Sequence, residues 1–355
     1  MPRISDGFTG IAVYIYESLG AAQEGDCFGA SGFLATVTLE EAPQRQAEYV
    51  VTNKHVIKDQ SHPWSTTRVI RLNRKDGTVE YISTTEDQWT CHRYGDDVAV
   101  FRLDTGWDAL SAASVDISQF VTPQLVADED IGIGDDTVMV GRFINRDGKQ
   151  QNTPSARFGN IAMMNGEAIH SDQLGIDQES FLVETRSLPG YSGSAVLVYS
   201  PCAMNDMSQR RGGHPKVTDL FVKNINDNAL RATCSAKGPF LLGIDWCHIP
   251  RRAVVRATNG DPIQYGWYVE ENTGMAGVVP AWKIAEVLNC EELMEARKKE
   301  AEEFKARSRP LDVSLDSAVS PQATQITPQG AEIPIPTQEQ FLDDLTKASR
   351  RVKPE

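Results

Sequence analysis

A serine lies between two glycines in the segment LPGYSGSAVLV, residues 188–198, directly before a run of strand-forming residues. One interpretation is a tight turn, because glycine adopts turn conformations at little steric cost. The other is that Ser192 is a nucleophile for acyl transfer. A serine hydroxyl is a weak nucleophile at neutral pH, so it needs a general base and a group that orients this base. The remaining sequence must therefore supply both groups.

The general base is best sought among the six histidines of the chain. His55 lies in EYVVTNKHVIKD, at the end of an apolar strand-like run, where a strand presents a side chain at the rim of a barrel. The others lie in polar connectors, in a loop, in a polar insertion or after a strand without suggestive neighbours: His62, His92, His170, His214 and His248. We therefore predict that His55 is the base.

The orienting carboxylate is predicted in YGDDVAVFRL, where Asp97 begins an alternating strand. Asp96 precedes it and is expected to face solvent. A buried aspartate that accepts a hydrogen bond from the imidazole fixes the tautomer and stabilises the imidazolium.

The glycines beside the serine also suit acyl transfer, which needs backbone N–H groups around a developing oxyanion. The N–H groups of Gly190 and Ser192 can converge if Gly190 adopts a conformation that a side chain would forbid. Gly193 would let the following turn pass close to the histidine. We predict that Gly190 and Ser192 supply the oxyanion hole.

The elements that must position these residues are short runs rich in Val, Ile, Tyr and Thr, separated by turn-forming clusters. A polar connector near residues 111–129 divides them into two sets of about six, and no helical periodicity competes before about residue 280. The first set is GIAVYIYES, CFGASGFLATVTL, AEYVVTN, TRVIRLNR, VEYISTT and DVAVFRL; the second is DTVMVGRF, SARFGNIAMM, SFLVET, SGSAVLVYS, FLLGIDWC and the pair GWYVEE and MAGVVPA. Each set can close a small barrel, so we predict an all-β fold of two six-stranded antiparallel β-barrels.

The predicted boundaries are 5–118 for the N-terminal barrel, which carries His55 and Asp97, and 119–285 for the C-terminal barrel, which carries Ser192. Both ranges are long enough for a compact domain.

Three segments stand outside this strand pattern. Residues 201–238 are polar and interrupt the second set, so we expect a long surface insertion that is either functional or disordered. Residues 281–308 contain helix formers and many Glu/Lys pairs at helical spacing, which predicts a C-terminal helix. Residues 309–355 are rich in Pro, Ser, Thr and Gln, which is typical of a flexible, disordered tail.

The bulk composition limits the partners and the compartment. The net charge of −14 and the scattered basic residues disfavour nucleic acid and anionic membranes. The apolar stretch 11–16 is too short for a signal peptide, and no run is long enough to cross a bilayer. We therefore expect a cytoplasmic protein.

The six cysteines do not form a disulfide scaffold in a chain of 355 residues, and we expect reduced thiols. Cys202, Cys234, Cys247 and His214 could gather around zinc, but their spacings match no CxxC-type pattern. A metal site stays the minor alternative, and we expect no metal and no cofactor.

Three segments resemble, in this order, the catalytic segments of the chymotrypsin/trypsin-like serine peptidases: VVTNKHV, DDVAVF and PGYSGSAVLV. They are most similar to the bacterial HtrA-type branch, with its TN-x-HV and GNSGG segments. FGASGFLAT resembles the strand before the catalytic histidine in that branch, and FLLGID followed by GMAGVVPA resembles the two late strands that wall the primary specificity pocket. The resemblance covers about residues 10–285. Any single segment is a weak signal, whereas all of them in matching order are specific.

This resemblance implies a chymotrypsin-like double barrel with the site in the cleft between the barrels. It implies His55 as general base, Asp97 as the orienting residue and Ser192 as nucleophile. The implied substrate is a protein or peptide.

The sequence departs from the family at three points. Tyr191 occupies the position where zymogen-activated trypsins have an aspartate that pairs with a newly cut N-terminus, so we predict activation without insertion of a new terminus at Arg3–Ile4. Ser194 replaces a glycine that is common in the family, and we expect no loss of activity. No PDZ-like segment follows the barrels, which puts the HtrA mode of peptide docking in doubt.

The pocket implied by the resemblance leaves the substrate preference open. Arg186 lies near the family's pocket-base position and would favour acidic substrate side chains, whereas Asp245 on a wall strand would favour basic ones. The two could pair and leave an apolar pocket, or either could face solvent. The residues expected around the pocket are Arg186, Leu188, Ile244, Asp245, Trp246 and Gly277.

Three alternatives to a freely active peptidase can be compared with the sequence. An α/β-hydrolase has its histidine downstream of the serine and alternates strands with helices, and neither holds here. A catalytically silent trypsin-fold module that binds a peptide or partner is disfavoured by the complete triad. We expect instead a peptidase controlled by a conformational change or by a regulatory protein partner, acting through the insertion 201–238 or the C-terminal tail.

Overall fold

The computed structural model describes a body of strands and helices and two short pieces near the C-terminus. The described residues are 4, 6–25, 29–58, 67–104, 109–143, 148–164, 168–171, 174–188, 190–199, 239–258, 264, 267–308, 324–326 and 332–334. The chain divides into two compact units, Met1–Ala306 and Arg307–Glu355. The predicted insertion 201–238 and most of the predicted tail lie outside the described residues.

The N-terminal half forms one eight-stranded sheet. Seven strands follow the order β5-β4-β1-β2-β3-β7-β6 with antiparallel neighbours, and β8 pairs in parallel with β2. The strands are β1 (Ala12–Tyr16), β2 (Ala30–Leu39), β3 (Ala42–Thr52), β4 (Thr67–Asn73), β5 (Val79–Thr85), β6 (Trp89–Cys91), β7 (Ala99–Leu103) and β8 (Val115–Asp116).

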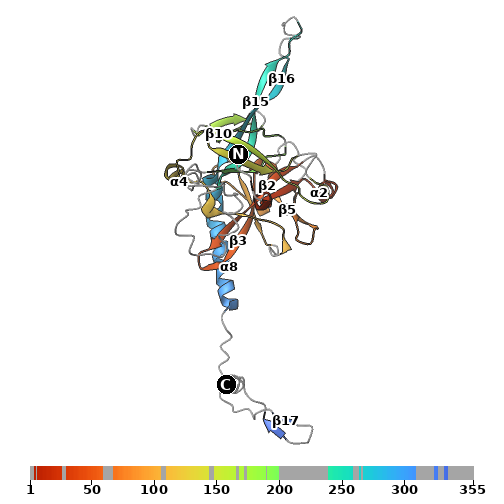
Figure 1. Cartoon of the computed structure of the whole chain (residues 1–355), viewed down its shortest axis with the longest axis vertical. Helices are drawn as coiled ribbons and strands as arrows, with labels where there is room; N and C mark the ends of the chain where they lie inside the picture. The colour runs from red at the N-terminus through yellow and green to blue at the C-terminus, as the bar shows by residue number, and fades with distance from the viewer. Residues whose placement is uncertain are drawn as a thin grey trace, which may run out of the picture. The chain divides into compact units, whose positions relative to one another are not determined.

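The C-terminal half of the body is a closed barrel with the order β10-β13-β16-β15-β14-β9. Its strands are β9 (Asp136–Gly141), β10 (Ser155–Met163), β13 (Phe181–Glu184), β14 (Ala195–Val198), β15 (Phe240–Val254) and β16 (Tyr268–Pro280). A separate hairpin is formed by β11 (Ala168–Ser171) and β12 (Ile176–Glu179). Strands β15 and β16 continue past the barrel as a two-stranded ribbon (Figure 1).

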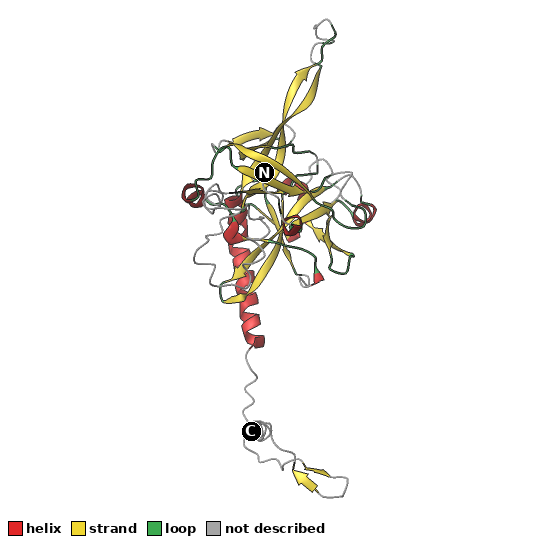
Figure 2. Cartoon of the chain, viewed as in Figure 1, coloured by secondary structure: helices red, strands yellow, loops and turns green. Residues whose placement is uncertain are grey.

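The predicted double-barrel fold class is confirmed, and strands are the main regular elements of the body (Figure 2). Two details differ from the sequence prediction. The N-terminal sheet is not a closed six-stranded barrel among the described residues, because β5 and the three-residue β6 remain its edges. The segments GWYVEE and MAGVVPA form the single strand β16 rather than a pair, because both pair with the uninterrupted β15.

The predicted C-terminal helix is divided into α7 (Ala281–Leu288) and α8 (Glu291–Ser308). Shorter helices are α1 (Asp6–Thr9), α2 (Leu19–Glu24), α3 (Lys54–Ile57) and α4 (Pro123–Asp128), with the 3-10 turns η1 (Glu86–Gln88) and η3 (Ile117–Gln119). None of the described helices is long and apolar enough to cross a membrane. In the second unit, where we predicted a disordered tail, the described residues form the antiparallel strands β17 (Thr324–Ile326) and β18 (Glu332–Pro334).

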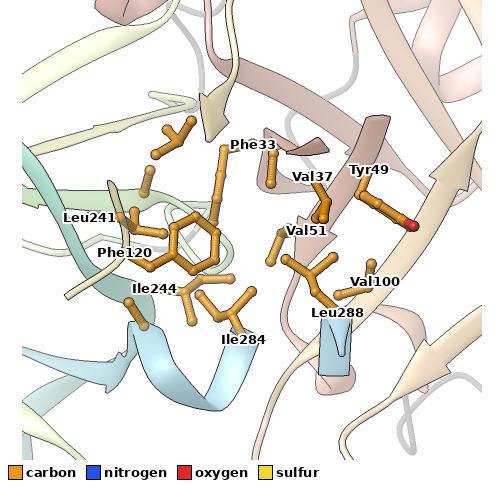
Figure 3. Close-up of a cluster of buried hydrophobic side chains, with 14 of the residues drawn as sticks. Phe33, Val37, Tyr49, Val51, Val100, Phe120, Leu241, Ile244, Ile284 and Leu288 are labelled. Atoms are coloured by element: carbon orange, nitrogen blue, oxygen red, sulfur yellow. The ribbon is translucent and has the colours of Figure 1, made fainter. Parts of the chain in front are cut away.

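The largest apolar core joins the two sheets and α7 (Figure 3). Phe33 and Val51 enter it from the N-terminal sheet, Ile244 from the barrel, and Ile284 and Leu288 from α7, and all five are fully buried. Burial of such side chains contributes about 1.5–3 kcal/mol each. Helix α7 is therefore part of the seam that fixes one sheet against the other.

Candidate active site

The predicted base and carboxylate lie together at the end of β3 and the start of β7. His55 is in the short helix α3, which follows β3 directly, and its ring Nδ1 lies 2.6 Å from Asp97 Oδ2. The backbone N–H of His55 donates to the other oxygen, Asp97 Oδ1, at 2.8 Å. Asn53 Nδ2 donates to the Asp97 carbonyl at 2.9 Å. With Nδ1 bound to this carboxylate, Nε2 is the ring nitrogen left to accept a proton.

Burial differs between the two partners in the way that general-base chemistry requires. The Asp97 side chain is 2% exposed, whereas the His55 ring is 23% exposed. The carboxylate is thus held away from solvent, while the imidazole keeps one open edge. We predicted that the adjacent Asp96 faces solvent, and this prediction is wrong. Its side chain is only 14% exposed and accepts a hydrogen bond from Gln178.

The serine loop, residues 190–194, contains two glycines with left-handed backbone angles. Gly190 and Gly193 have φ angles of 94° and 91°, which side chains rarely adopt. The N–H groups of Tyr191, Gly193 and Ser194 donate to the carbonyls of Leu188, Asp245 and Tyr191, respectively. Within the part of the chain that the structure describes, no hydrogen bond takes up the N–H groups of Gly190 or Ser192. These two donors are the ones predicted for the oxyanion hole.

The serine loop is fastened to the N-terminal sheet through Ser31 on β2. The Ser31 N–H donates to the Ser192 carbonyl at 2.9 Å, and its hydroxyl donates to the Gly190 carbonyl at 2.8 Å. Thr52, which ends β3 just before His55, donates to the Ser31 carbonyl at 2.8 Å. The loop is therefore tied to the strand that carries the histidine. Sequence analysis did not assign a role to Ser31, although FGASGFLAT contained the signal.

Position 193 admits only glycine, because the neighbouring atoms leave no room for a side chain. A Cβ atom added there would lie 1.9 Å from the Ser31 carbonyl oxygen and 2.5 Å from Thr52 Oγ1. The Ser192 hydroxyl and the His55 ring do not form a hydrogen bond with each other in this structure. Such bonds are often long without substrate and tighten only in the reactive complex.

Asp245 lies behind the serine loop and is fully buried. Its backbone N–H donates to the Ser194 carbonyl at 3.0 Å, and its side chain accepts a hydrogen bond from Ser187 at 2.9 Å. Burial raises the pKa of Asp245 to about 7, against the opposing effects of the Ser187 hydrogen bond and the charge of His55. A carboxyl group in the interior with this pKa changes its charge near neutral pH.

The other residues expected around the pocket are spread over different environments. Arg186 is exposed, forms no ion pair with Asp245 in the described structure, and its carbonyl accepts a hydrogen bond from Arg157 at 2.8 Å. Leu188 is half-buried, and Ile244 is in the core shared by the two sheets.

The wall strands β15 and β16 are in close contact. The Trp246 indole N–H donates to Ser180 Oγ at 2.8 Å. A Cβ atom added to Gly277 would lie 2.6 Å from Trp246 Nε1 and 2.9 Å from Cys247 Sγ. The space between the two strands is therefore too narrow for a residue larger than glycine at position 277.

Tyr191 is buried where a family aspartate would pair with a new N-terminus. Its hydroxyl makes a short hydrogen bond with Ser155, and the guanidinium of Arg157 lies 4.6 Å from the centre of its ring. Ser194, the other departure, is accommodated by Gly141, where an added Cβ atom would meet Ser194 Oγ at 1.8 Å. The Tyr191 hydroxyl thus has a hydrogen-bond partner, whereas the buried Ser194 hydroxyl has room beside Gly141 but no hydrogen-bond partner within the described structure.

The described residues contain no group of three or more His, Cys, Asp or Glu side chains that could hold a metal ion. Three members of the zinc alternative, Cys202, His214 and Cys234, lie outside the described residues.

The chain was compared with curated proteins, with solved structures and with family models. No curated protein matches the chain. Among solved structures, the apo protease domain of MamO from Magnetospirillum magneticum is 13% identical with a TM-score of 0.44, over 80% of this chain and 98% of that chain. Deg5 is 16% identical with a TM-score of 0.35, over 54% of this chain and 76% of that chain. A mutant of the tobacco etch virus protease is 13% identical with a TM-score of 0.38, over 82% and 83% of the two chains.

The family comparison covers the residues that carry the site. Residues 30–200, which include His55, Asp97 and Ser192, match the family described as the trypsin-like peptidase domain. The resemblance found in the sequence is confirmed at this level: the chain contains a trypsin-like peptidase domain.

Proposed function

We propose that this protein is a serine endopeptidase that hydrolyses peptide bonds through His55, Asp97 and Ser192. The observation that carries the proposal is the double contact of Asp97, which binds the His55 ring at 2.6 Å and the His55 backbone N–H at 2.8 Å. This contact fixes the ring orientation and the tautomer that a general base needs. Further support comes from the N–H groups of Gly190 and Ser192, which have no hydrogen-bond partner among the described residues.

In the proposed reaction, Ser192 Oγ attacks the carbonyl carbon of the substrate while His55 Nε2 takes the hydroxyl proton. The negative charge that develops on the carbonyl oxygen is stabilised by the N–H groups of Gly190 and Ser192. His55 then gives its proton to the leaving amine, and an acyl-enzyme forms at Ser192. Water, deprotonated by His55, releases the acyl group and restores the hydroxyl.

The proposed enzyme is active without insertion of a new N-terminus. Tyr191 supports this, because its buried ring and its contacts with Ser155 and Arg157 leave no carboxylate at that position to pair with an ammonium group. Chains that begin at Met1 and chains cut after Arg3 should therefore react equally with a fluorophosphonate probe. A probe reaction that requires the cut would refute this part of the proposal.

The test of the function itself is labelling with a fluorophosphonate and cleavage of an unfolded protein substrate such as casein, with Ser192→Ala as control. The wild-type chain should react in both assays, and the variant should react in neither. The missing hydrogen bond between Ser192 and His55 favours a second candidate, a catalytically silent module that binds peptides in the same site. Binding of the casein peptides by both chains without cleavage or labelling would establish this second function.

Control by a protein partner is the remaining part of the proposal. It is supported by the polar insertion 201–238, which interrupts the sequence between the serine strand and the wall strands. Deletion of residues 309–355 and shortening of 201–238 should change activation or complex formation. Variants that match the full chain in both properties would remove these segments as regulators.

A further inference from the structure

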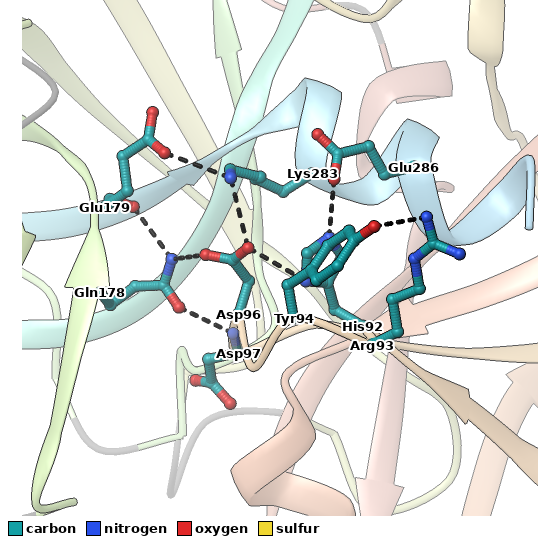
Figure 4. A network of polar contacts seen from close by, with 9 residues as sticks. All are labelled: His92, Arg93, Tyr94, Asp96, Asp97, Gln178, Glu179, Lys283 and Glu286. Atoms are coloured by element: carbon teal, nitrogen blue, oxygen red, sulfur yellow. Dashed lines mark hydrogen bonds and ion pairs between the residues drawn. The ribbon is translucent and has the colours of Figure 1, made fainter.

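A buried glutamine from the C-terminal half of the body binds the loop that carries Asp96 and Asp97, which we call the catalytic loop. Gln178, at β12, is 1% exposed (Figure 4). Its Oε1 accepts a hydrogen bond from the backbone N–H of Asp97 at 2.7 Å, and its Nε2 donates to Asp96 Oδ1 at 2.7 Å and to the Glu179 carbonyl at 3.1 Å. One amide thus binds two consecutive residues of the loop, and only one orientation of its oxygen and nitrogen satisfies all three contacts.

Asp96 carries a negative charge next to the catalytic carboxylate, and two cationic or proton-bearing groups face it. Its Oδ2 lies 3.3 Å from Lys283 Nζ and 3.0 Å from His92 Nδ1 (Figure 4). Lys283 also lies 3.2 Å from Glu179. Burial lowers the pKa of Lys283, but the charges and hydrogen bonds of Asp96 and Glu179 outweigh it, so that the pKa is raised. The cation is therefore stabilised where it faces Asp96.

Two residues of helix α7 take part in the polar contacts around Asp96. Lys283 and Glu286 lie on α7, and Glu286 Oε2 lies 2.9 Å from Nε2 of His92, whose side chain is 2% exposed. The His92 ring therefore lies between a carboxylate of the catalytic loop and a carboxylate of α7 (Figure 4). Because α7 is also buried in the apolar core through Ile284 and Leu288, its position is set independently of the polar contacts.

We infer that Gln178 and Lys283 are positioning residues for the catalytic carboxylate, Gln178 by binding the Asp97 backbone and Lys283 by compensating the charge of Asp96. This inference rests on the proposed serine-peptidase function. Neither residue touches the reacting atoms. Their effect passes through Asp97 to the orientation of His55, and a small error in such a geometry is sufficient to reduce the rate about 100-fold.

Gln178→Glu is the sharpest perturbation, because it keeps the size of the side chain and the acceptor for Asp97 but places a carboxylate oxygen against Asp96. The limiting rate of fluorophosphonate labelling should fall about 10- to 100-fold, with the half-saturating probe concentration unchanged. The ratio of the variant rate to the wild-type rate should rise as the pH falls from 8 to 6, because a proton shared by Glu and Asp96 removes the repulsion. Gln124→Glu is the matched control, since Gln124 donates to Asp128 at 2.8 Å on the exposed helix α4.

Lys283 gives an independent test that does not depend on the folding of a buried variant. Lys283→Met should lower the limiting labelling rate, and Lys283→Arg should restore it. Lys305→Met is the matched control, because it removes an exposed ion pair with Glu41 at 2.7 Å. A merely structural role would change the melting temperature of the Lys283 variants without a change in the limiting rate or in its pH dependence.

A readout by NMR separates this inference from the proposed activity. The NMR resonances of the His55 ring should shift in Gln178→Glu and Lys283→Met and stay at their wild-type positions in the two controls, even if the wild-type chain does not react with the probe. His55 ring resonances at their wild-type positions in both variants, together with wild-type labelling where labelling occurs, would overturn the inference.

Discussion

Gly193→Ala tests the tie between the serine loop and the N-terminal sheet most directly. The new methyl group would lie 1.9 Å from the Ser31 carbonyl oxygen and 2.5 Å from Thr52 Oγ1, at a φ of 91°. A left-handed backbone costs a side-chain-bearing residue about 1–2 kcal/mol, and an overpacked site adds about 1–3 kcal/mol. We expect the free energy of unfolding to fall by about 2–5 kcal/mol.

The loop can relieve the clash only by moving away from Ser31, and this movement also displaces the N–H groups of Gly190 and Ser192. We therefore expect the fluorophosphonate labelling rate to fall at least about 100-fold, as for removal of one oxyanion donor. Stability is measured by urea unfolding, and labelling by the probe assay at a temperature where the variant is folded.

Gly134→Ala is the control for this variant, because Gly134 has a φ of 99° and an added Cβ atom would meet nothing within 4 Å. It carries the cost of the backbone angle without the clash and should lose about 1–2 kcal/mol with normal labelling. If Gly193→Ala lost no more stability than Gly134→Ala and reacted at the wild-type rate, the close approach of the serine loop to β2 would be refuted.

Three further predictions concern the carboxylates and the seam. Asp97→Asn should reduce labelling by up to about 10⁴-fold, because an amide at this site favours the wrong tautomer of His55; a variant that reacts normally would exclude the orienting role. The raised pKa of Asp245 means that the folded state binds a proton more tightly than the unfolded state, so its stabilising effect is full below about pH 4 and is lost as the pH rises through about 7. The free energy of unfolding of Asp245→Asn, measured in urea, should therefore rise relative to that of wild type as the pH is raised from 5 to 8. If the two free energies depended on pH in the same way, the raised pKa of Asp245 would be contradicted. Ile284→Ala, which removes a fully buried side chain from the seam, should lower the free energy of unfolding by about 2–5 kcal/mol, and a loss below about 0.5 kcal/mol would show that α7 does not hold the seam.

The sequence was sufficient for the local parts of the site. His55 follows an apolar strand, Asp97 precedes one, and Gly190 and Gly193 lie on either side of the proposed nucleophile, so each signal lies within a few residues of the position that it predicts. The structure brings His55 and Asp97 together at 2.6 Å. The His55–Asp97 pair could be located because the chemistry of each member constrains its immediate neighbours, and the triad as a whole stays a prediction.

Contacts between distant segments escaped the sequence. Asp96 was expected to face solvent because its partners, Gln178 and Lys283, are far away in the chain and nothing in their local sequence indicates a contact with Asp96. The edges of the N-terminal sheet were missed for a similar reason, since strand closure depends on pairing and not on periodicity. For the pocket residues, residue type showed which side chains are charged but not where those side chains point. The exposed Arg186 and the buried Asp245 could therefore not be distinguished from the sequence.

The same distant contacts set the order in which the site can form. Ser31 and Gly190 are 159 residues apart, and His92 and Glu286 are 194 residues apart. Closing such long loops carries an entropic cost, and folds that depend on such contacts form slowly. During synthesis, His55 and Asp97 leave the ribosome well before β15, β16 and α7, which complete the barrel and pin the catalytic loop. A nascent chain therefore carries His55 and Asp97 before β15, β16 and α7 can fix their geometry, so the proposed activity requires the last strands to be in place.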